Sequence, residues 1–82
     1  MLKKEEKMNL SHIEKNKKVM IKEINSPMVL KKRLQSLGIG VGKEIEISEI
    51  SLQKNTIKIS LGFSFIALRM SEAKTIEVEE IV

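Results

Sequence analysis

The chain has 82 residues and a formal net charge of +4; 41% of its residues are hydrophobic and 32% are charged. This length and composition predict one small folded domain with little surface to spare for a deep catalytic cleft. The absence of cysteine excludes a disulfide framework and a cysteine-ligated metal site. The lack of a long apolar run or a signal-peptide pattern leads us to expect a cytoplasmic protein.

The N-terminal part of the chain divides into an extension and a first strand. Residues 1–8 mix Lys and Glu without apolar periodicity, which predicts a disordered extension ahead of a domain over residues 9–82. Residues 17–24 then alternate apolar and polar positions. Val19 and Ile21 fall on one face and lysines on the other, as in a half-buried strand.

A helical period follows this strand and ends at a glycine. Ser26 is the predicted N-cap, and Pro27 suits the first helical position because its missing N–H costs nothing there. Gly38 can adopt the left-handed conformation that ends a helix. The face expected to pack inward is formed, at helical spacing, by Leu30, Leu34 and Leu37.

The segment LGIGVGK, residues 37–43, contains three of the four glycines but does not fit a phosphate-binding loop. A P-loop ending at Lys43 needs glycine at position 37 and Ser or Thr at position 44, where this chain has Leu and Glu. We therefore interpret Gly40 and Gly42 as parts of the turn that leads into the next strand.

The C-terminal half predicts further strands. Residues 44–50 alternate Ile with Glu, and the slip in this alternation predicts a bulge near Ser48 and Glu49. Residues 57–61 alternate again and stop at Gly62, where a turn is expected.

Residues 63–70 form a mostly apolar run, which predicts a central strand. Ser71 is a candidate cap for one helical turn before a last alternating strand over residues 76–79. The chain is therefore predicted to be mostly β. We expect a small, closed SH3-like five-stranded barrel, with one short α-helix between strands 1 and 2 and a single helical turn before the last strand.

Two stretches, LKKRLQSLGIGVGKEIEI and IKISLGFSFIALRMSEAKTIEVEE, resemble the FeoA domain, a small SH3-like family. The resemblance extends from Leu10 to Glu80 and departs from the family pattern at Val41 and Asn16. The family implies docking on the cytoplasmic side of FeoB, the ferrous iron transporter, with membrane contact only through that partner. The elements that carry the resemblance are Leu37-Gly38, Gly42, Gly62, Ala67-Leu68-Arg69 and Glu72-Ala73.

No catalytic, cofactor or metal site is predicted. His12 is the only histidine, and a lone histidine without clustered ligands is more often a surface residue than an iron ligand. The two carboxylate pairs at residues 44 and 46 and at residues 77 and 79 each share a strand face, where they could weakly hold a cation or simply keep the face polar. No nucleophile and base pair is evident, so the chain is not expected to be an enzyme.

Positive charge is concentrated in the first 34 residues, which contain ten Lys or Arg against four Glu. This is either a solvated face or a surface for an acidic partner. The candidate partner-binding residues are Lys31, Lys32, Arg33 and Arg69. With two phenylalanines and no Tyr or Trp, neither nucleic-acid binding nor capture of proline-rich peptides is expected. The alternative function is that of an iron-linked regulatory domain, related to the C-terminal SH3-like domain of iron-dependent repressors.

Overall fold

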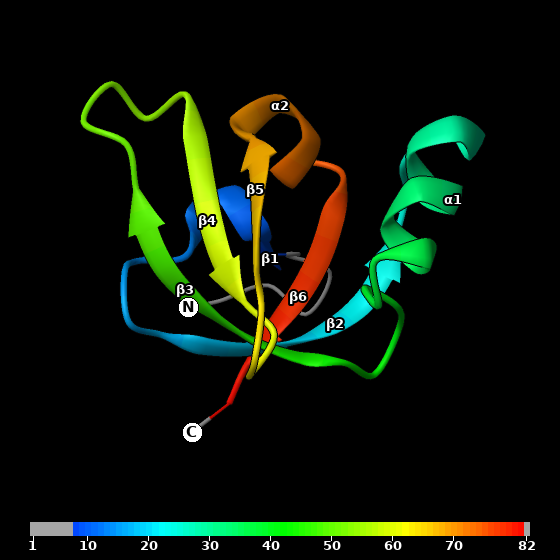
Figure 1. Ribbon diagram of the computed structural model, residues 1–82, viewed down its shortest axis with the longest axis horizontal. Coiled ribbons are helices and arrows are strands. Elements are labelled where there is room, and N and C mark those ends of the chain that lie inside the picture. The colour runs from blue at the N-terminus through cyan, green and yellow to red at the C-terminus, as the bar shows by residue number, and fades with distance from the viewer. Residues whose placement is uncertain (1–7, 82) are drawn as a thin grey trace, which may run out of the picture.

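The fold of residues 8–81, the part of the chain that the computed structural model describes, is an antiparallel sheet accompanied by short helices (Figure 1). The elements in chain order are β1 (Met8–Asn9), η1 (Leu10–His12), β2 (Lys18–Ile24), α1 (Met28–Ser36), β3 (Glu44–Ile50), β4 (Thr56–Ser60), β5 (Phe65–Arg69), α2 (Met70–Ala73) and β6 (Ile76–Glu80).

The sheet has six strands in the order β1-β6-β2-β3-β4-β5 within the described residues, and it is not closed. The predicted five-stranded closed barrel is therefore wrong in strand number and in closure. The additional strand is β1, in which Met8 pairs with Val78 and Asn9 with Glu77. Two residues are too few to produce an alternating pattern, so this strand has no sequence signal. Met8 thus belongs to the sheet and not to the predicted N-terminal extension, and the rest of that extension, residues 1–7, lies outside the described residues.

Two register shifts bend the sheet. One lies between Ile47 and Glu49 in the β3–β4 pair, where the sequence predicts a bulge. The other lies between Ile21 and Glu23 in the β2–β6 pair. Irregularities of this kind increase the local twist of a strand. Such bends curl the sheet around its apolar side, and in Figure 1 β2 passes behind β5.

The core lies on the inner face of this sheet and confirms the predicted alternation. The inward-facing apolar residues of β2, β4 and β6 are buried, as are Ile45 and Ile47 of β3, whereas Ile50 at the end of β3 is half-buried against the core. Residues 8–81 contain no buried polar or charged residue. Leu10 from η1 and Ala73 from α2 join the same cluster. The strand residues of the core are Val19, Ile21, Ile24, Ile45, Ile47, Ile57, Ile59, Leu68, Ile76 and Val78.

The α1 helix ends as predicted. Gly38 has a φ of +92°, and its N–H donates to the carbonyl of Gln35 at 3.1 Å. The Ile39 N–H donates to the carbonyl of Leu34 at 2.9 Å, which completes a Schellman motif. Leu34 and Ile39 are both fully buried, so the motif also fastens the end of the helix to the core.

Two other expectations for α1 are wrong. The N-cap position is occupied by Pro27, not Ser26, and no side chain caps the helix start. Leu37 is 40% exposed, because the chain turns away at the C-cap and Ile39 takes the inward position instead. Leu30 is half-buried against the core.

The predicted central position of the apolar segment 63–70 is also wrong. Its ordered part is β5, which lies at the edge of the sheet and pairs only with β4 among the described strands. Of the β5 residues only Leu68 is buried, while Phe65 is 62% exposed. Gly42 lies in the turn before β3 and Gly62 in the turn between β4 and β5. Their φ values of +91° and +111° match the turn roles expected for them.

Candidate functional site

The four basic residues that the sequence identifies as candidates come from two elements. Lys31, Lys32 and Arg33 are consecutive on α1, and Arg69 is the last residue of β5. Lys32, Arg33 and Arg69 are exposed, and Lys31 is half-buried. Neither Lys31 nor Lys32 forms an ion pair with another residue of the described chain.

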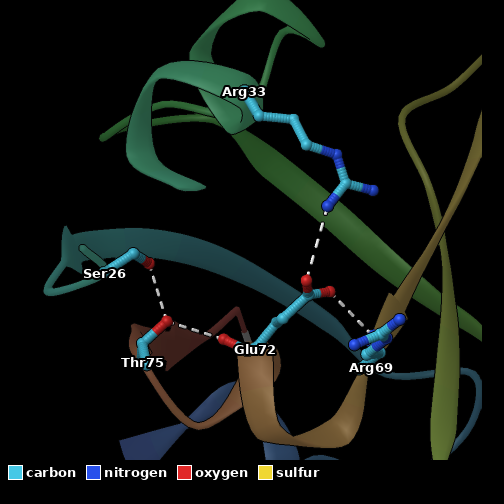
Figure 2. A network of polar contacts seen from close by, with 5 residues as sticks. All are labelled: Ser26, Arg33, Arg69, Glu72 and Thr75. Carbon is cyan, nitrogen blue, oxygen red and sulfur yellow. Dashed lines mark hydrogen bonds and ion pairs between the residues drawn. The ribbon is translucent and has the colours of Figure 1, made fainter. Parts of the chain in front are cut away.

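The structure connects Arg33 with Arg69 through the carboxylate of Glu72 on α2 (Figure 2). Glu72 Oε1 accepts a hydrogen bond from the backbone N–H of Arg69 at 2.9 Å. Glu72 Oε2 lies 3.4 Å from Nη1 of Arg33. The first contact caps α2 at its N-terminus, so the predicted cap, Ser71, is wrong. The N-cap is Arg69, two residues earlier, and the helix uses a glutamate in its first turn.

A second polar chain fixes the other end of α2 to the segment before α1. The Thr75 hydroxyl donates to the carbonyl of Glu72 at 2.7 Å and lies 2.6 Å from the hydroxyl of Ser26 (Figure 2). The N–H of Asn25 donates to the Thr75 carbonyl at 2.8 Å. Ser26 is thus used in a contact between distant segments and not as a helix cap. The two polar chains together orient α1 relative to α2.

The outward side of α1 also carries apolar residues that were not among the sequence candidates. Met28 is 65% exposed and Val29 is 84% exposed. At 100° per residue these two side chains share one side of the helix with Lys32, opposite the buried Leu34. We call Met28, Val29 and Lys32 the α1 face. The helical period already contained this signal, since Met28 and Val29 fall outside the stripe of Leu30 and Leu34.

The candidate metal-binding residues belong to three different elements: His12 to η1, and the two carboxylate pairs to β3 and β6. His12 is exposed, and its Nδ1 accepts the N–H of Asn9 at 3.3 Å. Within residues 8–81 no group of three or more His or Glu side chains is placed to hold a metal ion. Glu79 instead forms an ion pair with Lys22 at 3.3 Å. Glu44 is exposed and Glu46 half-buried at the same sheet face.

Within the described part of the chain, no helix combines the length and the apolar character needed to cross a lipid bilayer.

Comparison with known proteins assigns the chain to a family. Residues 8–80 match the model of the FeoA domain. The chain is 38% identical over 71 residues to "Putative Fe(2+) transport protein A" of Campylobacter jejuni, an alignment that covers 87% of this chain and 96% of the relative.

Solved structures with low sequence identity share the fold. The FeoA protein of Chlorobium tepidum superposes with a TM-score of 0.87 at 19% identity, covering 92% of this chain and 71% of that one. The metal-dependent transcriptional regulator MtsR superposes with a TM-score of 0.78 at 18% identity, covering 89% of this chain and 34% of the regulator. The small SH3-like fold therefore occurs both in FeoA proteins and within larger regulators. The match to the domain model over nearly the whole chain decides between them: the chain belongs to the FeoA family.

Proposed function

We propose that this protein is a non-enzymatic accessory module of ferrous iron uptake that acts in the cytoplasm by docking on a FeoB-type transporter. The observation that carries the proposal is the FeoA domain match over residues 8–80. The Campylobacter jejuni relative, named for Fe(2+) transport, supports the same process. The transporter would be the protein's only link to the membrane.

The α1 face is the docking surface that we propose, together with Arg33 and with Arg69, which Glu72 links to Arg33. Met28 and Val29 give it an apolar centre, and the basic side chains of Lys32 and Arg33 give it a charged border. Protein interfaces commonly have this arrangement, in which buried apolar groups supply affinity and charges supply orientation and association rate. The contacts of Glu72 and Thr75 hold the helix in place, so little freedom would be lost on binding.

The decisive experiment measures binding of the purified protein to the cytoplasmic part of a FeoB-type transporter by calorimetry, at low and at physiological salt. Replacing Lys31, Lys32 and Arg33 together by Ala should weaken binding about tenfold or more. The matched control replaces Lys15, Lys17 and Lys18 by Ala, which removes the same charge from a segment outside α1. Equal losses in both triple variants would mean that net charge alone drives the interaction.

The apolar part of the surface needs its own variant. Val29→Ser removes an exposed apolar side chain, so we expect a change of less than about 0.5 kcal/mol in the free energy of unfolding. If the α1 face docks as proposed, the same change should raise the dissociation constant several-fold. Val41→Ser is the control, since Val41 is similarly exposed, at 70%, and lies in the turn after the helix.

The alternative function is that of an iron-linked regulatory domain, favoured by the fold shared with MtsR. A regulator that contacts DNA directly would lose affinity steeply with salt because counterions are released from the phosphates. We expect negligible binding of duplex or single-stranded DNA at physiological salt. Tight DNA binding together with no transporter binding would replace our proposal with the regulatory one.

A further inference from the structure

The outer edge of β5 is open within residues 8–81. β5 pairs with β4 on one side, and no described strand pairs with its other side (Figure 1, where β5 is the strand at the front). Edge strands usually carry proline, a bulge or an inward charge that prevents pairing with other chains. The β5 sequence, Phe-Ile-Ala-Leu-Arg, has no proline, and its register against β4 is regular.

Hydrogen bonds at the two ends of the β4–β5 pair determine which backbone groups face outward. The Leu61 N–H donates to the Ser64 carbonyl at 2.9 Å, and the Met70 N–H donates to the Asn55 carbonyl at 2.7 Å. In an antiparallel ladder every second residue makes such bonds with the neighbouring strand. The even-numbered residues of this segment are therefore bonded to β4, and the odd-numbered ones direct their N–H and C=O groups away from it.

Three residues of β5 consequently present backbone groups at the open edge. Phe65 and Ala67 each offer an N–H and a C=O, and Arg69 offers its C=O. The remaining group, the N–H of Arg69, already donates to Glu72 Oε1 at 2.9 Å. The edge thus has both donors and acceptors along one short, regular strand.

We propose that this edge pairs with β5 of a second copy of the chain, antiparallel and centred on Ala67. In this register Ala67 faces Ala67 of the second copy, and each exchanges an N–H···O=C bond with the other. Each Phe65 faces Arg69 of the other copy, and the Phe65 N–H donates to the Arg69 carbonyl. The arrangement is two-fold symmetric and closes at two copies, which blocks further addition at this edge.

The side chains of β5 fit a second copy better than an arbitrary strand because they are complementary to themselves. Phe65 is 62% exposed, and the register places the other copy's Arg69 guanidinium beside its ring, where a cation–π contact is favourable. Ala67, at the symmetry axis, is exposed and small enough to let the two strands approach. Ile66 faces Leu68 of the other copy on the apolar side of the sheet.

The lysines near this edge do not oppose the pairing. Lys58 lies opposite Ala67 on β4, and its Nζ is 5.5 Å from the centre of the Phe65 ring. Two strands would separate the Lys58 positions of the two copies, a distance of about 14 Å for three strand spacings. This distance exceeds the Debye length of about 8 Å at physiological salt, so their repulsion is screened.

The contact would be weak, because a pair of five-residue strands buries less than the roughly 1,200 Å² of a stable specific interface. We expect a dissociation constant on the order of 100 μM, which calls for measurement at high concentration. Sedimentation equilibrium of the full chain from about 10 μM to about 1 mM should show a reversible dimer. The amide resonances of Phe65 and Ala67 should shift with concentration, because their N–H groups become bonded.

A charge-pair experiment tests the symmetric register. Ala67→Lys and Ala67→Glu each place like charges opposite each other at the axis, so each variant alone should remain monomeric up to about 1 mM. An equimolar mixture should dimerise again, because Lys then faces Glu. Both variants should fold as the wild type does, since Ala67 is exposed and its N–H lies outside the β4–β5 ladder.

Two further variants separate strand pairing from other self-association. Ala67→Pro removes the central N–H without breaking a bond to β4 and should abolish the dimer. Lys58→Ala, the control on the neighbouring strand, should leave it intact. A wild-type chain that stays monomeric to about 1 mM would overturn the proposal, whatever else occupies the edge. A mixture of the Lys and Glu variants that remains monomeric would equally overturn the register centred on Ala67.

Discussion

Glu72 on α2 lies 3.4 Å from the guanidinium of Arg33 on α1, although the two residues are 39 positions apart in the chain. The same carboxylate caps α2 through the N–H of Arg69. One side chain therefore orders two of the four basic candidates, and it does so where α1 meets the rest of the domain. This relationship makes Glu72 the position from which α1 can be loosened without changing any residue of the α1 face.

Replacing Glu72 should separate its two roles. Glu72→Ala removes the cap and the ion pair and should lower the free energy of unfolding by about 1 kcal/mol. Glu72→Gln keeps an oxygen that accepts the Arg69 N–H and should cost less than about 0.5 kcal/mol, because Arg33 is half-exposed and such ion pairs contribute little. Urea unfolding measures both. Equal losses for the two variants would show that the charge, and not the cap, dominates.

The contact between Ser26 and Thr75 should behave as one unit. Thr75→Val removes the hydroxyl that reaches both Ser26 and the Glu72 carbonyl and should cost about 1 kcal/mol. Ser26→Ala alone should cost less, because Thr75 keeps its bond to the carbonyl. The double variant should lose less unfolding free energy than the sum of the two single losses, as expected for two partners in direct contact. Strict additivity in denaturant unfolding would contradict a direct hydrogen bond.

Gly38, at the end of α1, should be sensitive to substitution. Its φ of +92° disfavours any side chain, although a Cβ at this position would meet no neighbouring atom within 4 Å. Gly38→Ala should therefore destabilise the fold by about 1 kcal/mol through backbone strain alone. Gly40→Ala is the matched control, since Gly40 has equally open surroundings without a positive φ. We expect its urea midpoint to stay near that of the wild type.

The isolated protein should not bind ferrous iron through His12. This side chain is exposed and bonded locally to Asn9, and a single imidazole does not make a selective iron site. Anaerobic calorimetry should detect only weak binding that His12→Ala leaves unchanged. A saturable one-to-one site of micromolar affinity that disappears in this variant would show that His12 is an iron ligand.

The sequence alone determined those features that depend on residues close together along the chain. Alternation along residues 44–50 and 57–61 predicted which side chains are buried, because a strand has a period of two. The glycine after the leucine stripe predicted the end of α1, because only glycine adopts a positive φ at little cost. The order of short motifs, from Leu37-Gly38 to Glu72-Ala73, pointed to the FeoA family that the domain match then showed.

Only the tertiary structure decided features that depend on distant segments. The apolar β5 lies at the edge because strand order follows from pairing across the whole sheet, which hydrophobicity does not encode. Ser26 does not cap α1, and its hydroxyl instead lies 2.6 Å from that of Thr75, 49 residues away. Arg33 likewise pairs with a residue far away in the chain, Glu72, which is 39 positions further on. Local periodicity carries no information about which partner a polar side chain or an open strand edge will find once the chain has folded.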